Sequence, residues 1–232
     1  MQNRDARIAG FLYLIAIIVG FLTLQYLPET VIQPGDAIAT AHNIAANQFR
    51  FRLLIVGDIA AGTVWLFVVL ALYRLLKGVD PEQAALMVVL GAFMQVPLYF
   101  VGVVNYAGAL LSVTDTSFLS VFSTAQRDAL AMLFLRLHHY QFQASLIFAG
   151  LWLFPFGILV FKSRFLPRTL GVLLIINGFA WLAISLTSFL IPQYGAVVDK
   201  VTSPMLFGEF AVTLWLLIVG ARTLGPFRKS VG

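Results

Sequence analysis

Residues 136–170 read RLHHYQFQASLIFAGLWLFPFGILVFKSRFLPRTL. The stretch opens with a dense set of polar side chains, becomes purely apolar through Phe161, and ends in the basic turn of Lys162, Arg164 and Arg168. An apolar run of about 20 residues is long enough to cross the hydrocarbon core of a bilayer. The stretch therefore predicts one membrane helix that has several polar side chains at its start and a basic cytoplasmic anchor at its end.

The composition of the whole chain agrees with a membrane protein. Hydrophobic residues make up 60% of the 232 residues and charged residues only 11%, and the mean hydropathy is +0.93. A soluble domain of this size needs a far more polar surface. The net charge of +5 does not indicate nucleic-acid binding, because the basic residues stand at the ends of apolar runs. The absence of cysteine excludes disulfides, thiolate catalysis and cysteine-ligated metal sites.

The order of apolar runs predicts an all-α fold, a polytopic integral membrane protein built as a bundle of six transmembrane helices. We expect one domain over residues 1–232, with short surface helices on the outer face and both termini cytoplasmic. The predicted spans are 8–27, 52–76, 82–111, 129–162, 170–191 and 204–221. With this topology ten of the 15 lysine and arginine residues fall on the cytoplasmic side, as the positive-inside rule requires. The chain therefore contacts the lipid bilayer directly.

Local signals refine this outline. Asp36 is placed to cap a short surface helix with Ala41 and Ile44 on its apolar side, which we interpret either as a lid over a pocket or as a connector. Pro97 should kink the third span near mid-membrane and free a backbone carbonyl. Ser123 and Gln126 have capping-box spacing, so the fourth helix should begin near residue 124 and project from the bilayer. Residues 192–203 are expected to form a short outer loop.

Two motifs resemble a known family. Residues 150–182 contain G-x-W-x-x-P-x-G, then the turn K-S-R-F-L-P-R, then L-G and an apolar helix carrying Asn177. The opening R-x-A-G-x-x-Y-L, from Arg7 to Leu14, is similar to how the same family begins. The chain thus resembles the bacterial membrane proteins grouped as domain of unknown function 4386. The resemblance implies a six-span architecture in the cell membrane of a bacterium, and it implies no activity.

Several polar residues within the spans are candidates for a ligand site. Arg136, His139, Tyr140 and Gln143 share one face of the fourth helix because they lie at helical spacing. Asp58 and Glu209 fall at similar depth on the second and sixth spans. An ionisable group in hydrocarbon is costly unless it is paired or hydrated, so these side chains should face the bundle interior. We expect a polar cavity open to the outside, with Arg136 or Arg52 opposite the two carboxylates.

The predicted function is binding of a small molecule or lipid in that outward-facing cavity. The predicted ligand-binding residues are Asp58, Arg136, His139, Gln143, Glu209, Arg52 and Asn105. In this interpretation Arg136 binds an anionic group, and Asp58 and Glu209 balance it or accept protons.

Other interpretations stay open. The charged pairs can simply hold helices together, or the chain can be an accessory or assembly subunit that binds partner membrane subunits. A third alternative is an enzyme on a lipid-soluble substrate, with His139 as acid–base. No metal site and no cofactor are assigned, although a His42–His139 haem pair or a zinc site of His139, Asp58 and Glu209 is conceivable. Gly150 and Gly157 are expected to permit close helix packing.

Overall fold

A computed structural model describes residues 2–114 and 117–222, and within these residues every regular element is a helix. The elements in chain order are α1 (Gln2–Gly20), η1 (Phe21–Tyr26), α2 (Leu27–Val31), α3 (Ala37–Ala46), α4 (Gln48–Leu76), α5 (Pro81–Val88), η2 (Val89–Phe93), α6 (Val96–Val113), η3 (Ser117–Leu119), α7 (Thr124–Leu151), α8 (Leu153–Lys162), α9 (Arg168–Leu190), η4 (Pro192–Tyr194), α10 (Gly195–Thr202), η5 (Ser203–Leu206) and α11 (Phe207–Ile218). The all-helical prediction is confirmed for the part of the chain described.

Six helical stretches among these residues are long and apolar enough to cross a membrane, which confirms the predicted number of spans. They are Gln2–Val31, Gln48–Leu76, Pro81–Val113, Thr124–Lys162, Arg168–Leu190 and Pro192–Ile218. Most extend beyond the predicted boundaries at one or both ends. The chain is therefore a multi-pass membrane protein whose lipid-facing surface contacts the bilayer.

The prediction of a loop at residues 192–203 is wrong. The segment is helical, with η4 followed by α10, and α10 packs against α9. Pro192 lies in the first turn of the helical segment, where its missing N–H has no intrahelical partner to lose. The first residue of the predicted loop thus begins a helical segment.

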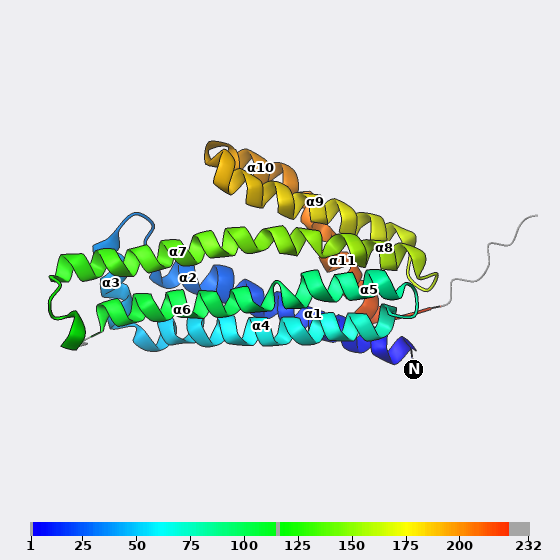
Figure 1. Ribbon diagram of the computed structural model, residues 1–232, viewed down its shortest axis with the longest axis horizontal. Coiled ribbons are helices and arrows are strands. Elements are labelled where there is room, and N and C mark those ends of the chain that lie inside the picture. Colours follow the sequence, from blue (N-terminus) through cyan, green and yellow to red (C-terminus); the bar gives the residue numbers. More distant parts are fainter. Residues whose placement is uncertain (1, 115–116, 223–232) are drawn as a thin grey trace, which may run out of the picture.

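The long helices run roughly along one axis, and the two described ends of the chain meet at the same end of the bundle (Figure 1). There the Ala221 amide donates to Asn3 Oδ1 at 3.2 Å, and the Arg222 amide donates to the Phe165 carbonyl at 3.3 Å. At this end Lys162 also donates to Asp80 at 2.9 Å, and this hydrogen bond is the main reason why the pKa of the Asp80 carboxyl is lowered. The opposite end carries α3 and the start of α7 (Figure 1).

Glycines allow α9 to approach its neighbours closely. A Cβ atom at Gly157 of α8 would lie 2.7 Å from the Gly171 carbonyl oxygen of α9, and one at Gly150 of α7 would lie 2.7 Å from the Gly178 carbonyl oxygen. Both distances are too short for a side chain, and backbone atoms have little freedom to retreat. The expectation that Gly150 and Gly157 serve close packing is confirmed.

The first, third and fourth spans lose regular α-helical structure shortly before a proline. The π-helical segment η1 precedes Pro28, the π-helical segment η2 and a turn precede Pro97, and the α7–α8 junction at Trp152 precedes Pro155. Proline cannot donate the hydrogen bond of a regular helix, and its ring clashes with the carbonyl four residues earlier. The predicted kink at Pro97 is confirmed. Side chains compensate there, since Trp65 Nε1 donates to the Gly91 carbonyl at 2.8 Å.

The apolar core is divided into two clusters. The larger cluster lies toward the end with the chain termini and includes Trp65, Trp152 and Leu216. The smaller one lies toward α3 and includes Ile44 and Tyr106. On α4 the residues between the two clusters include Gly57, Asp58 and Gly62. The division leaves a polar layer across the middle of the bundle.

The short helix α3 packs over the smaller cluster. Asp36 caps it as predicted, accepting a hydrogen bond from the Ala39 amide at 2.9 Å. Ala41 and Ile44 are buried as predicted, and Thr40 is buried beside them while Ile38 is exposed. The Thr40 hydroxyl bonds to the Gln33 backbone, which satisfies its polarity inside the contact. The predicted capping box of Ser123 and Gln126 is confirmed at the start of α7.

Candidate functional site

A central cavity of about 170 Å³ lies in the polar layer of the bundle. Each of the six spans contributes to its wall. Outside the fourth span its lining residues are Leu24, Asp58, Trp65, Gln95, Leu98, Tyr99, Trp181 and Glu209. Leu24 lies in η1 and Gln95 in the turn after η2, so two of the irregular segments border the cavity. Irregular backbone at membrane depth is tolerated where it is enclosed by protein or lines a cavity.

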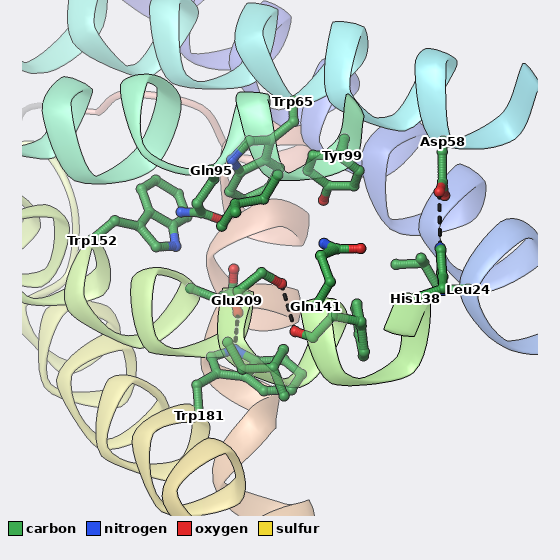
Figure 2. A pocket seen from close by; sticks show the side chains of 15 residues that line it. Leu24, Asp58, Trp65, Gln95, Tyr99, His138, Gln141, Trp152, Trp181 and Glu209 are labelled. Atoms are coloured by element: carbon green, nitrogen blue, oxygen red, sulfur yellow. Dashed lines mark hydrogen bonds and ion pairs between the residues drawn. The ribbon is translucent and has the colours of Figure 1, made fainter. Parts of the chain in front are cut away.

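The fourth span lines the cavity along one continuous stripe. The stripe consists of His138, Gln141, Phe142, Ser145, Leu146, Ala149 and Trp152. These residues recur at intervals of three and four, which places them on one face of a helix. Gln141 lies between the Asp58–His138 pair on one side and Glu209 on the other (Figure 2).

Asp58 and His138 form a buried pair at one end of the cavity. The distance from His138 Nε2 to Asp58 Oδ2 is 3.0 Å, and the residues are only 1% and 8% exposed. The Tyr106 ring stacks on the His138 ring with centroids 3.8 Å apart, which fixes the imidazole plane. Gly102 provides space for the pair, since a Cβ atom there would lie 2.6 Å from Asp58 Oδ2.

Glu209 receives hydrogen bonds from two aromatic side chains. Tyr13 donates its hydroxyl to Oε1, and Trp181 Nε1 donates to Oε2 at 2.8 Å. The Glu209 amide donates to Asn177 Oδ1 at 3.1 Å, which ties the first turn of α11 to α9. Within residues 2–114 and 117–222 no lysine, arginine or histidine lies within ion-pair distance of this carboxylate.

Aromatic rings form much of the remaining wall. Trp65 and Trp152 pack edge to face with centroids 4.9 Å apart, and Tyr13 lies edge-on to Trp65 at 5.6 Å. Figure 2 shows Trp65, Gln95 and Trp152 grouped at the end of the cavity away from Asp58. Gln95 Nε2 donates to the Leu90 and Phe148 carbonyls, both at 3.3 Å, and so links the kinked third span to α7.

Some polar atoms on the cavity wall have no partner within the described protein. They are Asp58 Oδ1, Gln141 Oε1 and Trp152 Nε1. A buried polar atom without a hydrogen bond is costly, and most such atoms in folded proteins are satisfied by protein, water or a ligand. Each atom belongs to a residue that lines the cavity, although the atom itself is almost fully covered by protein.

Of the predicted binding residues, Asp58 and Glu209 line the central cavity, and the others lie outside its wall. Arg136 and His139 line a separate, open hollow with Ile32 and Tyr140. Gln143 faces α9, where its Oε1 accepts from the Ser188 hydroxyl at 3.1 Å. Arg52 is exposed, and Asn105 is partly buried outside the cavity wall.

The prediction that Arg136 or Arg52 lies opposite the two carboxylates is wrong. Asp58 pairs with His138, and Glu209 is bound by Tyr13 and Trp181. The fourth helix carries two polar stripes, and the second one, containing His138, Gln141 and Ser145, faces the cavity. Its spacing was visible in the sequence, whereas the partners of Glu209 on α1 and α9 had no local signal.

The residues of the conceivable haem and zinc sites do not lie together in the structure. No group of three histidine, aspartate or glutamate side chains in the described ranges is placed to hold a metal ion. His139 and the carboxylates of Asp58 and Glu209 lie in different hollows. His42 lines a third hollow with Arg127 and Asp128, apart from His139.

A profile of the family described as "Domain of unknown function (DUF4386)" matches residues 8–220. The chain belongs to the DUF4386 family. No similar curated protein and no similar solved structure was found. The resemblance based on the motifs in residues 150–182 and at Arg7–Leu14 is thereby confirmed. In this DUF4386 chain the first of these motifs supplies Trp152 to the cavity and Gly157 to the α8–α9 contact.

The cavity of this DUF4386 protein combines an apolar wall with a few ionisable groups. It offers two carboxylates, one histidine and a mostly aromatic and aliphatic wall. Binding cavities typically have an apolar lining with a few convergent polar groups. The arrangement can hold a small, partly apolar molecule and orient it by its polar atoms.

Proposed function

We propose that this protein binds a small molecule or a lipid group in the central cavity. The observation that carries this proposal is the convergence of all six spans on one polar layer. Polar contacts between membrane helices also occur where no ligand binds, but here polar residues from several spans border one shared cavity. Burying the polar side chains of Asp58, Gln141 and Glu209 at this depth costs free energy. Contacts with a bound ligand explain why these side chains are there.

The proposal includes an outward orientation. The end of the bundle that holds both described chain ends also holds Arg4, Arg74, Lys162 and Arg168, and it is the more basic end. By the positive-inside rule we place this end in the cytoplasm of a bacterium, with the protein in its plasma membrane. The Asp58–His138 pair then lies at the outer side of the cavity, below the cluster covered by α3.

Native mass spectrometry of the protein in mild detergent tests this function. After incubation with an extract of bacterial lipids and metabolites, we expect the wild-type protein to retain a ligand mass. Ala149→Phe puts a ring into the cavity wall and should remove most of that mass. Ala129→Phe adds the same ring at an exposed position of the same helix, and should keep it.

An unliganded mass for the wild-type protein under these conditions would contradict the proposal and favour an accessory subunit of a membrane complex. If Ala149→Phe and Ala129→Phe retain the ligand mass equally, the ligand binds outside the cavity.

One observation supports a second candidate. His138 is oriented by Asp58 and stacked by Tyr106 in the cavity wall, and a histidine held by a carboxylate is the usual arrangement of a general base. An enzyme acting on a lipid-soluble substrate would use His138, in place of the His139 expected from the sequence. Turnover of the retained ligand that is lost in His138→Gln would favour it.

A further inference from the structure

We propose that the cavity takes a ligand with one positive charge on nitrogen, an amine or an ammonium group attached to a small apolar body, and that Glu209 is its counter-charge. This inference rests on the proposed binding function and names its ligand class. It reverses the expectation that an arginine would bind an anionic group here.

The charge balance of the wall is the first argument. Among the described residues that line the cavity there are two carboxylates and one histidine but no lysine or arginine. His138 lies within 3.0 Å of Asp58 and can balance that carboxylate alone. Glu209 has only the neutral donors Tyr13 and Trp181. With both carboxylates ionised and His138 protonated, the residues of the wall carry a net negative formal charge, and a cation complements it.

The geometry around Glu209 leaves it able to bind. A carboxylate offers about four lone-pair sites, and Glu209 uses one hydrogen bond on each oxygen. The two bonds hold the group in one orientation without filling its acceptor capacity. The remaining acceptor positions of the Glu209 carboxylate can receive an N–H donor group of a ligand.

The aromatic wall is the third argument. Trp65, Tyr99, Trp152 and Trp181 border the same space as Glu209. Aromatic faces attract organic cations, tryptophan most strongly, and the attraction increases when the pair is shielded from water. The same rings would gain nothing from an anion. Leu24, Leu98 and Leu146 complete an apolar surface for the body of the ligand.

The size of the cavity limits that body. Its volume of about 170 Å³ is close to the roughly 150 Å³ of an engineered protein cavity that binds benzene. One ring or a short branched chain beside the amine fills the space. Benzylamine, benzyl alcohol and benzoate are therefore matched probes, similar in size and shape but cationic, neutral and anionic at neutral pH.

Tryptophan fluorescence of the full-length protein in detergent micelles tests the inference, because three of the four tryptophans line the cavity. We expect benzylamine to bind the wild-type protein at least tenfold more tightly than benzyl alcohol, and benzoate to bind most weakly. Glu209→Gln keeps the size of the side chain and an acceptor oxygen. In this variant benzylamine and benzyl alcohol should bind about equally tightly. Glu82→Gln removes a charge from an exposed position and should keep the preference.

The outcomes separate the two proposals. Benzyl alcohol or benzoate binding as tightly as benzylamine would overturn the cation inference and leave the binding function standing. No saturable response to any of the three probes would overturn both. A preference that survives in Glu209→Gln would overturn the role of Glu209. If that variant does not fold, the wild-type selectivity still tests the charge of the ligand without any substitution.

Discussion

Replacing Gly171 by leucine is expected to lower the free energy of unfolding by about 3 kcal/mol, the upper end of the usual penalty for overpacking. A Cβ atom at this position would lie 2.6 Å from the Gly157 carbonyl oxygen and 2.8 Å from the Phe161 amide nitrogen. Both are backbone atoms of α8, so α8 and α9 must move apart as whole helices. The thermal midpoint in detergent should fall by roughly 6–12 °C.

Gly20→Leu is the matched control, because Gly20 also lies in a membrane-spanning helix but a Cβ atom there would have no neighbour within 4 Å. We expect little change in its thermal midpoint. If both variants unfold at the wild-type temperature, the α8–α9 contact is not as close as described.

Removing either member of the Asp58–His138 pair is expected to cost about 3–5 kcal/mol of unfolding free energy, because the remaining polar group stays buried without its partner. Asp58→Leu leaves the imidazole unpaired, and His138→Leu leaves the carboxylate unpaired. The double variant removes both polar groups and should be more stable than the sum of the single effects predicts, by about 2 kcal/mol.

The pair of Lys162 and Asp80 provides the comparison. The lysine side chain is 53% exposed, and exposed ion pairs contribute little to stability. We expect a double-mutant cycle on this pair to give a much smaller coupling. Additive effects at Asp58 and His138 would mean that the two side chains do not interact, and the polar layer would then need another explanation.

The sequence was sufficient for the spans but not for the pairing inside them. Apolar length and caps such as Ser123 identify the helices, and Pro97 identifies a break, because these effects are local. Glu209 bonds to Tyr13, 196 residues earlier in the chain, and no local pattern encodes such a contact. The order in which helices surround the cavity has to be known first.

The choice between the two faces of the fourth helix illustrates the same limit. The stripe with Arg136, His139 and Gln143 and the stripe with His138, Gln141 and Ser145 have equivalent spacing. The first carries the stronger charge and was preferred for that reason. In the structure Arg136 is exposed on α7 and lines an open hollow with Ile32 and Gly35, which lie between α2 and α3, and there a charge can reach water or lipid head groups. The second, less charged stripe faces the cavity, where His138 pairs with Asp58.

Thiol labelling of Ser145→Cys tests most directly whether a small solute can enter the central cavity. The natural chain has no cysteine, so aminoethyl methanethiosulfonate can react only at the introduced thiol. Ser145 lines the cavity, whereas Ser185 is fully buried and bonds to the Gln143 carbonyl at 2.7 Å. We predict that Ser145→Cys is labelled at least tenfold faster than Ser185→Cys and is protected by Ala149→Phe. Equal, slow labelling of both cysteines would contradict the account of a ligand-accessible cavity.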